Sequence, residues 1–229
     1  MSALAEAAFS AAATSARIAQ SLAAAERCEQ PFRHWLLSGV LPERLAEAVR
    51  GLPFAVPSIA DTGGKRETHN ALRQFFAGAR LEQGPCAAIA GAFQDAATVA
   101  ALQEMTGAAL GGASLRIEYC LDTDGFWLEP HTDIGAKLFT MLIYLSTGPG
   151  SAEWGTDLMS PAGEVLGRAP GSANSGLIFV PAADTWHGFA RRPISGVRRS
   201  LIINYVRPEW RARHELAFPN QPVTTGRAA

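Results

Sequence analysis

The fold is decided by the stretch Leu128-Glu-Pro-His131-Thr-Asp133-Ile-Gly-Ala-Lys137-Leu-Phe-Thr-Met-Leu-Ile-Tyr144-Leu-Ser146. It joins a histidine–carboxylate pair to an apolar run that predicts a buried strand. His131 and Asp133 are two residues apart, and side chains two apart on an extended chain point to the same face. An imidazole nitrogen and a carboxylate oxygen would therefore leave the backbone side by side, able to bind one metal ion.

A second histidine, His187, stands 56 positions after His131 in Asp184-Thr-Trp-His187-Gly. Two histidines and one carboxylate are the ligand set of a non-haem Fe(II) facial triad, which leaves coordination positions open. A histidine two residues before an aspartate also arises by chance, so the pair alone is weak evidence. The strand after the pair and the predicted strand that begins at His187 strengthen the interpretation as a metal site.

The rest of the chain predicts helices first and strands second. Apolar periodicity and turn residues predict helices over 2–27, 42–52 and 86–106, a strand over 31–39 and a loop over 53–70. Alternation and apolar runs predict strands over 114–120, around the ligand pair near His131, and over 138–146, 154–160, 175–181, 187 onward and 198–206.

This order of elements predicts an α+β fold. We expect an antiparallel double-stranded β-helix, or jelly roll, with the N-terminal helices packed on one face. Residues 1–229 would form one domain, in which 1–113 give mainly helical support, 114–206 form the jelly-roll core and 207–229 form a C-terminal tail on the surface.

Composition excludes several classes of partner. Of the 229 residues, 48% are hydrophobic and 18% charged, which is ample material for a core. The formal net charge of −1 argues against nucleic acid or an anionic membrane as the main partner. Three widely spaced cysteines without a CxxC indicate a reducing compartment. The alanine-rich start resembles neither a secretory signal nor a membrane span, so we expect a soluble cytoplasmic protein. No oligomeric state is indicated.

The last predicted strand carries an arginine that would point inward. Its two faces would hold Arg198, Ser200, Ile202 and Asn204 on one side, and Arg199, Leu201 and Ile203 on the other. An inward guanidinium is costly unless it meets an anion. A dicarboxylate cosubstrate would satisfy Arg198 through two parallel hydrogen bonds, with Ser200 adding a third. Alternatively, Arg198 pairs with a buried Asp or Glu, or turns outward.

These motifs resemble the HxD…H…RxS signature of the Fe(II)- and 2-oxoglutarate-dependent dioxygenases, particularly the prolyl-hydroxylase-like branch. The resemblance covers roughly residues 114–206 and rests on His131-Thr-Asp133, His187 and Arg198-Arg-Ser200. It implies Fe(II), 2-oxoglutarate and O2 as cofactor and cosubstrates, with ascorbate as a supporting reductant in vitro. It also implies that His131, Asp133 and His187 bind the iron, and that Arg198 pairs with the distal carboxylate of 2-oxoglutarate.

The resemblance also suggests roles for three further residues. Tyr144 stands where relatives often have a tyrosine that donates to the same carboxylate, and Tyr119 is a second candidate of that kind. Asn204 stands where some relatives have tryptophan, and its amide suits a hydrogen bond near the metal.

The implied reaction is hydroxylation of an unactivated C–H of a small molecule, with release of succinate and CO2. Such a substrate could be an amino acid, a sugar derivative or a natural-product intermediate. A carboxylate at Asp133 argues against halogenation, because halogenating relatives have a small residue there. The open alternatives are desaturation, cyclisation or epimerisation with the same cofactors, hydroxylation of a peptide or protein side chain, and a cupin-like metal-binding or sensing module without turnover.

Candidate substrate contacts come from aromatic and basic side chains near these motifs. Aromatic groups line many pockets and also fill many cores, and the candidates here are Phe126, Trp127, Trp154 and Trp186. His69 and Arg73 stand at the end of the predicted loop, where binding residues concentrate. Lys137, Arg191 and Arg192 could attract an anionic substrate or form a solvated basic edge.

Overall fold

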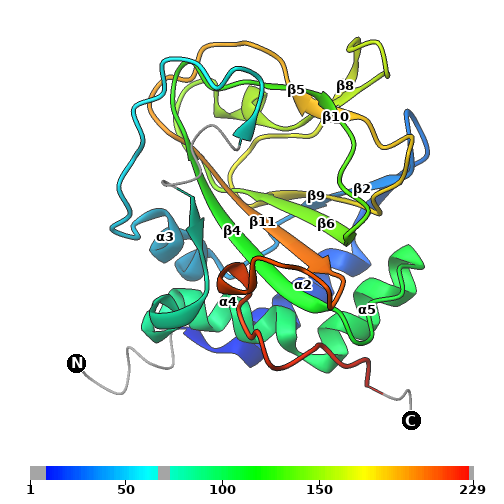
Figure 1. The fold of residues 1–229 in the computed structure, drawn as a ribbon. Helices are drawn as coiled ribbons and strands as arrows, with labels where there is room; N and C mark the ends of the chain where they lie inside the picture. Colours follow the sequence, from blue (N-terminus) through cyan, green and yellow to red (C-terminus); the bar gives the residue numbers. More distant parts are fainter. Residues whose placement is uncertain (1–8, 67–72, 227–229) are drawn as a thin grey trace.

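The computed structural model describes residues 9–66 and 73–226, which form two antiparallel sheets and a layer of helices (Figure 1). The larger sheet has seven strands in the order β1 (Glu26–Cys28), β2 (His34–Ser38), β9 (Ser175–Phe179), β6 (Lys137–Tyr144), β11 (Arg198–Val206), β4 (Ser114–Asp122) and β3 (Gln74–Phe75). The smaller sheet has four, in the order β5 (Leu128–His131), β10 (His187–Phe189), β7 (Asp157–Met159) and β8 (Val165–Arg168).

The strands from β4 to β11 wind between the two sheets. β4, β6, β9 and β11 belong to the larger sheet, whereas β5, β7, β8 and β10 belong to the smaller one. All neighbouring strands are antiparallel. This winding is that of a jelly roll, and the predicted fold class is confirmed.

Alternation along β11 separates two layers of core. Leu201 and Ile203 are fully buried in the cluster between the larger sheet and the helices. Ile202 points the other way, to a cluster between the sheets that includes Tyr144 and Phe179. The two faces predicted for this strand are therefore confirmed, and the second face is the interior of the jelly roll.

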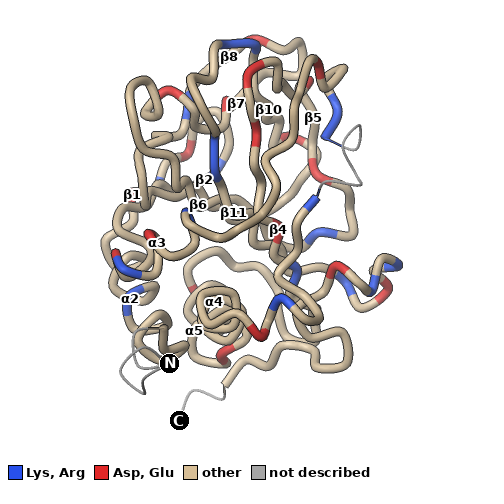
Figure 2. The backbone as a smooth tube through the Cα atoms, turned by 90° about the vertical axis from the view of Figure 1, so that its left-hand side faces the viewer, with Lys and Arg blue, Asp and Glu red and all other residues tan. Residues whose placement is uncertain are grey.

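Among the described residues, four α-helices cover the outer face of the larger sheet: α2 (Ala11–Ala23), α3 (Glu43–Arg50), α4 (Gly84–Gln94) and α5 (Ala96–Thr106). Figure 2 shows few charged positions on α4 and α5, as their burial requires. The prediction of one helix over 86–106 is wrong, because Asp95 is extended (ψ 131°) and caps a new helix by accepting a hydrogen bond from the Thr98 amide. Gly107 ends α5 with φ +77°, a left-handed conformation that favours glycine.

Three short edge strands were not predicted: β1, β3 and β8. The side chains of β1 and β8 are largely exposed and β3 has only two residues, so none of the three carries an alternating apolar pattern. The helix predicted over 2–27 runs from Ala11 to Ala23, its predicted end falls in β1, and residues before Phe9 lie outside the described part. The loop predicted over 53–70 is irregular as far as Arg66. Three short 3-10 helices complete the described chain: η3 (Gly78–Glu82), η4 (Ser151–Trp154) and η5 (Arg213–Glu215).

The C-terminal segment does more than cover the surface. After β11 it turns back along β4, where the Ala217 amide donates to the Leu115 carbonyl (3.0 Å) and the Val223 amide to the Ala113 carbonyl (2.8 Å). This path brings Glu215 inside, with 8% of its surface exposed. The C-terminal segment is largely exposed, as expected, but its residues Trp210 and Glu215 line the interior cavity.

Within the described residues, no single helix is long and apolar enough to cross a membrane. The pair α4 and α5 reaches the required length and composition only when the two are taken together, across a bend of 57°.

Candidate metal centre

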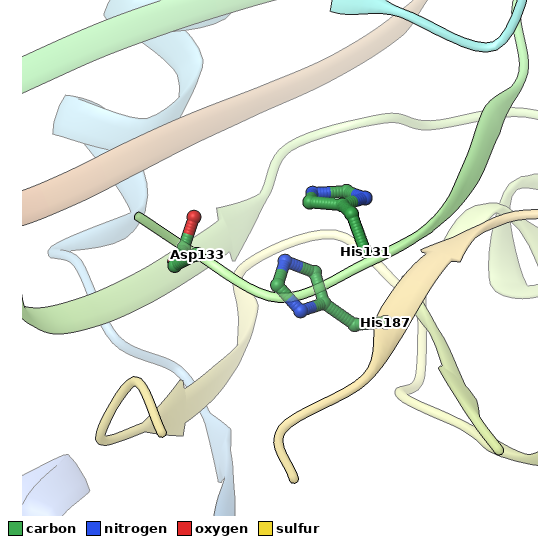
Figure 3. Close-up of side chains that lie close together, drawn as sticks. All are labelled: His131, Asp133 and His187. Atoms are coloured by element: carbon green, nitrogen blue, oxygen red, sulfur yellow. The ribbon is translucent and has the colours of Figure 1, made fainter. Parts of the chain in front are cut away.

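Strand pairing brings the two predicted histidine ligands together. His131 at the end of β5 lies directly opposite His187 at the start of β10, with ring centroids 4.4 Å apart. Asp133 follows two residues after His131. One ligand atom from each of the three side chains lies within 4.8 Å of the others, and Figure 3 shows the three converging from two segments. The predicted cluster is thus formed, with spacing that one metal ion could bridge.

Backbone carbonyls orient both imidazole rings. Nδ1 of His131 lies 2.8 Å from the Glu129 carbonyl oxygen, and Nδ1 of His187 lies 2.9 Å from that of Thr185. A ring that donates from Nδ1 keeps the Nε2 lone pair for a metal. Burial lowers the pKa of His187 to about 4, although Asp133 opposes the shift. The ring is therefore neutral at neutral pH, which is the form that binds metals.

Asp133 is held by the larger sheet. Thr140 on β6 donates a hydrogen bond to Oδ2 (2.6 Å), and the Lys137 ammonium donates to Oδ1. Asn204 on β11 in turn donates to the Thr140 hydroxyl (2.9 Å). Burial would raise the pKa of Asp133, but the Lys137 charge, the charge that His187 carries at low pH and these hydrogen bonds outweigh it and hold the pKa at about 2. Asn204 therefore lies near the candidate metal position and supports Asp133 indirectly, through the Thr140 hydroxyl.

The three candidate ligands line a cavity of about 400 Å³ between the sheets. Strand register places its two ends far apart, because Arg198 of β11 pairs with Asp122 of β4 while Asn204 pairs with Arg116. Six residues of strand span roughly 20 Å. The cavity wall toward Arg198 also contains Leu142, Thr156, Phe189 and Ile202. The wall toward Arg116 contains Arg73, Glu118, Trp210 and Glu215.

Arg198 points inward, as predicted, and only 3% of it is exposed. Its Nη1 donates to Oδ2 of Asp122 (2.5 Å) and its Nε donates to the Trp154 carbonyl (2.7 Å). Pairing with a buried carboxylate was the alternative left open by the sequence. However, the same carboxylate accepts a bond from Arg66 (3.0 Å), so two guanidiniums share one anion. The contacts of Arg198 use two of its five N–H groups, and the pair of arginines keeps a positive excess.

Two of the side chains predicted beside Arg198 lie at the same end. Ser200 is fully buried, and its hydroxyl has no hydrogen-bond partner among the described residues. Tyr144, opposite Ser200 on β6, donates to the Thr156 hydroxyl (2.8 Å) and accepts from the Thr156 amide (3.1 Å). Thr156 lines the cavity, whereas Tyr144 and Ser200 do not.

Tyr119 requires a correction. It lies on the face of β4 that packs against the helical layer, with ring centroids 5.8 Å from Phe54 and 6.2 Å from Phe76. Alternation along β4 turns Glu118 into the metal cavity, whose wall does not include Tyr119. Arg116 and Glu118 point into the cavity, so Tyr119, one position further along the strand, points to the opposite face.

The predicted aromatic contacts also lie outside this cavity wall. Phe126 and Trp154 are buried in a separate cluster with Phe189. Trp127 donates from its indole to Asp61 (2.5 Å) and lies under Arg191, while Trp186 precedes His187 without lining the cavity. Arg73 does line it, and His69 lies outside the described residues.

The far wall is a buried ladder of alternating charges, of which only Arg73 was named from the sequence. Arg73 binds Glu118 through two hydrogen bonds (2.8 and 2.7 Å). Arg116 then donates to Glu118 (2.9 Å), to Glu215 (2.5 Å) and to Asn204 (3.1 Å). The period-two pattern of Ser114-Leu-Arg-Ile-Glu could have revealed the two strand members, because it puts both on the inward face. No local pattern could have revealed Glu215 or Trp210.

No family model matches the sequence, and neither does any curated protein. Among solved structures, the chain is similar to a Pseudomonas putida prolyl-4-hydroxylase, with a TM-score of 0.53 and 16% identity over 85% of this chain and 94% of that one. A 2OG-Fe(II) oxygenase family oxidoreductase from Burkholderia pseudomallei gives a TM-score of 0.50 and 17% identity, over 90% and 93%.

A viral collagen prolyl hydroxylase from Paramecium Bursaria Chlorella virus-1, solved as a complex with 2OG (2-oxoglutarate), gives a TM-score of 0.50 and 12% identity, over 76% and 96%. The low identities restrict what these similarities show to the fold. Together with the winding of eight strands between two sheets, they show that this chain has the fold of the 2OG-Fe(II) oxygenase family, prolyl hydroxylases included.

Proposed function

We propose that this chain is an Fe(II)- and 2OG-dependent oxygenase that hydroxylates a C–H of a small polar molecule. The observation that carries the proposal is the convergence of His131, Asp133 and His187 in a cavity that also holds an inward guanidinium. The donor set fits Fe(II), since it combines two oriented imidazoles with one ionised carboxylate and leaves the cavity side open. The shared fold supports the same assignment.

The Arg198 end fits a dicarboxylate. Two guanidiniums share the single carboxylate of Asp122 there, so a further anion would improve the balance of charge. Arg198 and Thr156 both line the cavity at this end, whereas the unpartnered Ser200 hydroxyl, two residues along the same strand face, lies outside the cavity wall. We assign the distal carboxylate of 2OG to Arg198 and Thr156.

The protein's own part in the reaction is binding and orientation. When bound, Fe(II) and 2OG would supply the oxidising chemistry, consuming O2 and giving succinate and CO2. His131, Asp133 and His187 fix the position of that chemistry, and Leu142, Phe189 and Ile202 form an apolar lining that limits water near it. The ladder of Arg73, Glu118, Arg116 and Glu215 faces the remaining space and would orient a polar substrate by hydrogen bonds.

Replacing Arg198 with glutamine should weaken 2OG binding to the Mn(II)-loaded protein by about 10- to 100-fold, the value of a charge-assisted hydrogen bond. Affinity for Mn(II) itself should change less than about threefold, because Arg198 does not contact the three ligands. Calorimetry measures both constants, and a thermal melt confirms that the variant is folded. Arg191→Gln is the matched control, since Arg191 is exposed and pairs with Asp61 on the outside.

The activity test is succinate release from 2OG with Fe(II), ascorbate and candidate substrates. Wild-type protein that binds neither Mn(II) nor 2OG would refute the proposed function. An Arg198→Gln variant that binds 2OG as tightly as wild type would refute only the role of this arginine.

A further inference from the structure

The cavity wall carries more positive than negative charge. Among the described residues that line it, six are basic (Lys65, Arg66, Arg73, Arg116, Lys137 and Arg198) and four are acidic (Glu118, Glu129, Asp133 and Glu215). Asp122, behind Arg66 and Arg198, adds a fifth anion. The divalent metal and the doubly charged cosubstrate of the proposed function cancel each other. One positive charge therefore remains for the substrate to meet.

Most of the cations are already committed to a partner. Arg73 and Arg116 alternate with Glu118 and Glu215 in the buried ladder, which is neutral as a whole. Arg66 and Arg198 share Asp122 and would share the distal carboxylate of 2OG. Lys65 and Glu129 are both exposed at the mouth, where solvent screens their charges. The remaining cation is Lys137.

Lys137 pairs with Asp133, which is also a candidate metal ligand. Its ammonium donates to Oδ1 of Asp133, and its side chain is 20% exposed while that of Asp133 is 4% exposed. A divalent ion on Asp133 carries twice the charge of that carboxylate and repels the nearby ammonium. Metal binding thus leaves a half-buried lysine beside the metal, facing the cavity, without a counterion.

On the basis of the proposed function, we propose that Lys137 binds a carboxylate group of the substrate, which makes the substrate a small carboxylic acid. Lys137 exchanges Asp133 for this carboxylate once the metal is bound. Because its ammonium contacts a metal ligand, the acid group is held close to the metal, and the carbon that reacts lies near the acid group. The C1 carboxylate of 2OG is a second carboxylate that could bind Lys137 in place of the substrate.

The first experiment needs no knowledge of the substrate. It is a crystal structure of the wild-type protein with Mn(II) and 2OG. We expect the Lys137 ammonium to have left Asp133 and to face the space between the metal and the arginine–glutamate ladder. An ammonium that still binds Asp133, or that binds the C1 carboxylate of 2OG, would overturn the proposal.

The second experiment compares Lys137→Gln with Lys65→Gln, the same change at the exposed mouth of the same cavity. Calorimetry should show that Lys137→Gln binds Mn(II) at least as tightly as wild type, because the proposal has the metal displace this ammonium from Asp133. The 2OG dissociation constant should stay within about threefold of wild type. A 2OG affinity that falls tenfold or more would assign the lysine to the cosubstrate and refute its role in substrate binding. Wild-type protein without Mn(II) or 2OG binding would instead refute the proposed function itself.

The same variants are then assayed for succinate release with the common L-amino acids, the matching 2-hydroxy acids and the carboxamides of both. We expect one or more acids to stimulate wild type and Lys65→Gln, their amides to fail, and Lys137→Gln to raise the KM for the acid at least tenfold. Acids and amides that behave alike, or a Lys137→Gln variant with unchanged KM, would contradict the proposal.

Discussion

Replacing His187 with alanine should lower the affinity for Mn(II) by at least about 100-fold, equivalent to about 2.7 kcal/mol. His187 is one of three convergent ligands, its ring is oriented by the Thr185 carbonyl, and it is 7% exposed. Changes to groups that merely support a ligand already cost 10- to 100-fold in metal affinity. Loss of the ligand itself should cost more, and succinate release should fall with it.

Isothermal calorimetry with Mn(II) measures this effect without any substrate. His214→Ala is the matched control, since His214 is exposed and stands apart from the three ligands. Its Mn(II) affinity should equal that of wild type. If His187→Ala, shown by circular dichroism to be folded, binds Mn(II) within tenfold of wild type, the metal centre is misassigned.

Replacing Asp122 with alanine should destabilise the protein by about 3–5 kcal/mol, the usual cost of removing one partner from a buried ion pair. Asp122 is 2% exposed and is the shared acceptor of Arg66 (3.0 Å) and Arg198 (2.5 Å). Without it, two largely buried guanidiniums would lose the anion that they share. Their mutual repulsion and lost hydrogen bonds add to the cost.

Urea unfolding measures this change in the free energy of unfolding. Asp122→Asn keeps an acceptor oxygen and should lose less than the alanine variant. Asp184→Ala, in an exposed loop, should stay within about 0.5 kcal/mol of wild type. Mn(II) with 2OG should raise the stability of Asp122→Ala more than that of wild type, because the cosubstrate supplies the missing carboxylate. A loss below about 1 kcal/mol would show that the two arginines do not depend on Asp122.

The fold and the three candidate ligands could be predicted because their signals are local. The alternation in Arg198–Val206 assigns each side chain to the interior or to the helical layer, and the HxD spacing places two ligands on one face. His187 could be added because it begins a strand. The pairing that sets it opposite His131 is a long-range property of the jelly roll.

Apart from Arg73, the ladder could not be predicted, because its members come from three separate segments: the one before β3, β4 and the one after β11. Glu215 reaches Arg116 only after the chain has turned back along β4, across 99 positions of sequence. The aromatic residues chosen from sequence fill a separate core cluster or lie outside the wall, since apolar character indicates burial and not which cavity a ring faces. Tyr119 was expected to reach the cosubstrate, but it stands one position after the cavity-lining Glu118. A difference of one position on a strand turns the side chain to the opposite face.

The division of the candidate ligands between the two sheets has a mechanical consequence. His131 and His187 stand on the smaller sheet, whereas Asp133 is fastened through Thr140 and Asn204 to the larger one, which the helices support. An ion that binds all three would cross-link the layers at the point where the jelly roll opens. A chelator would then remove a cross-link between the two sheets as well as the metal needed for the reaction. The smaller sheet would be the first part of the fold to lose stability.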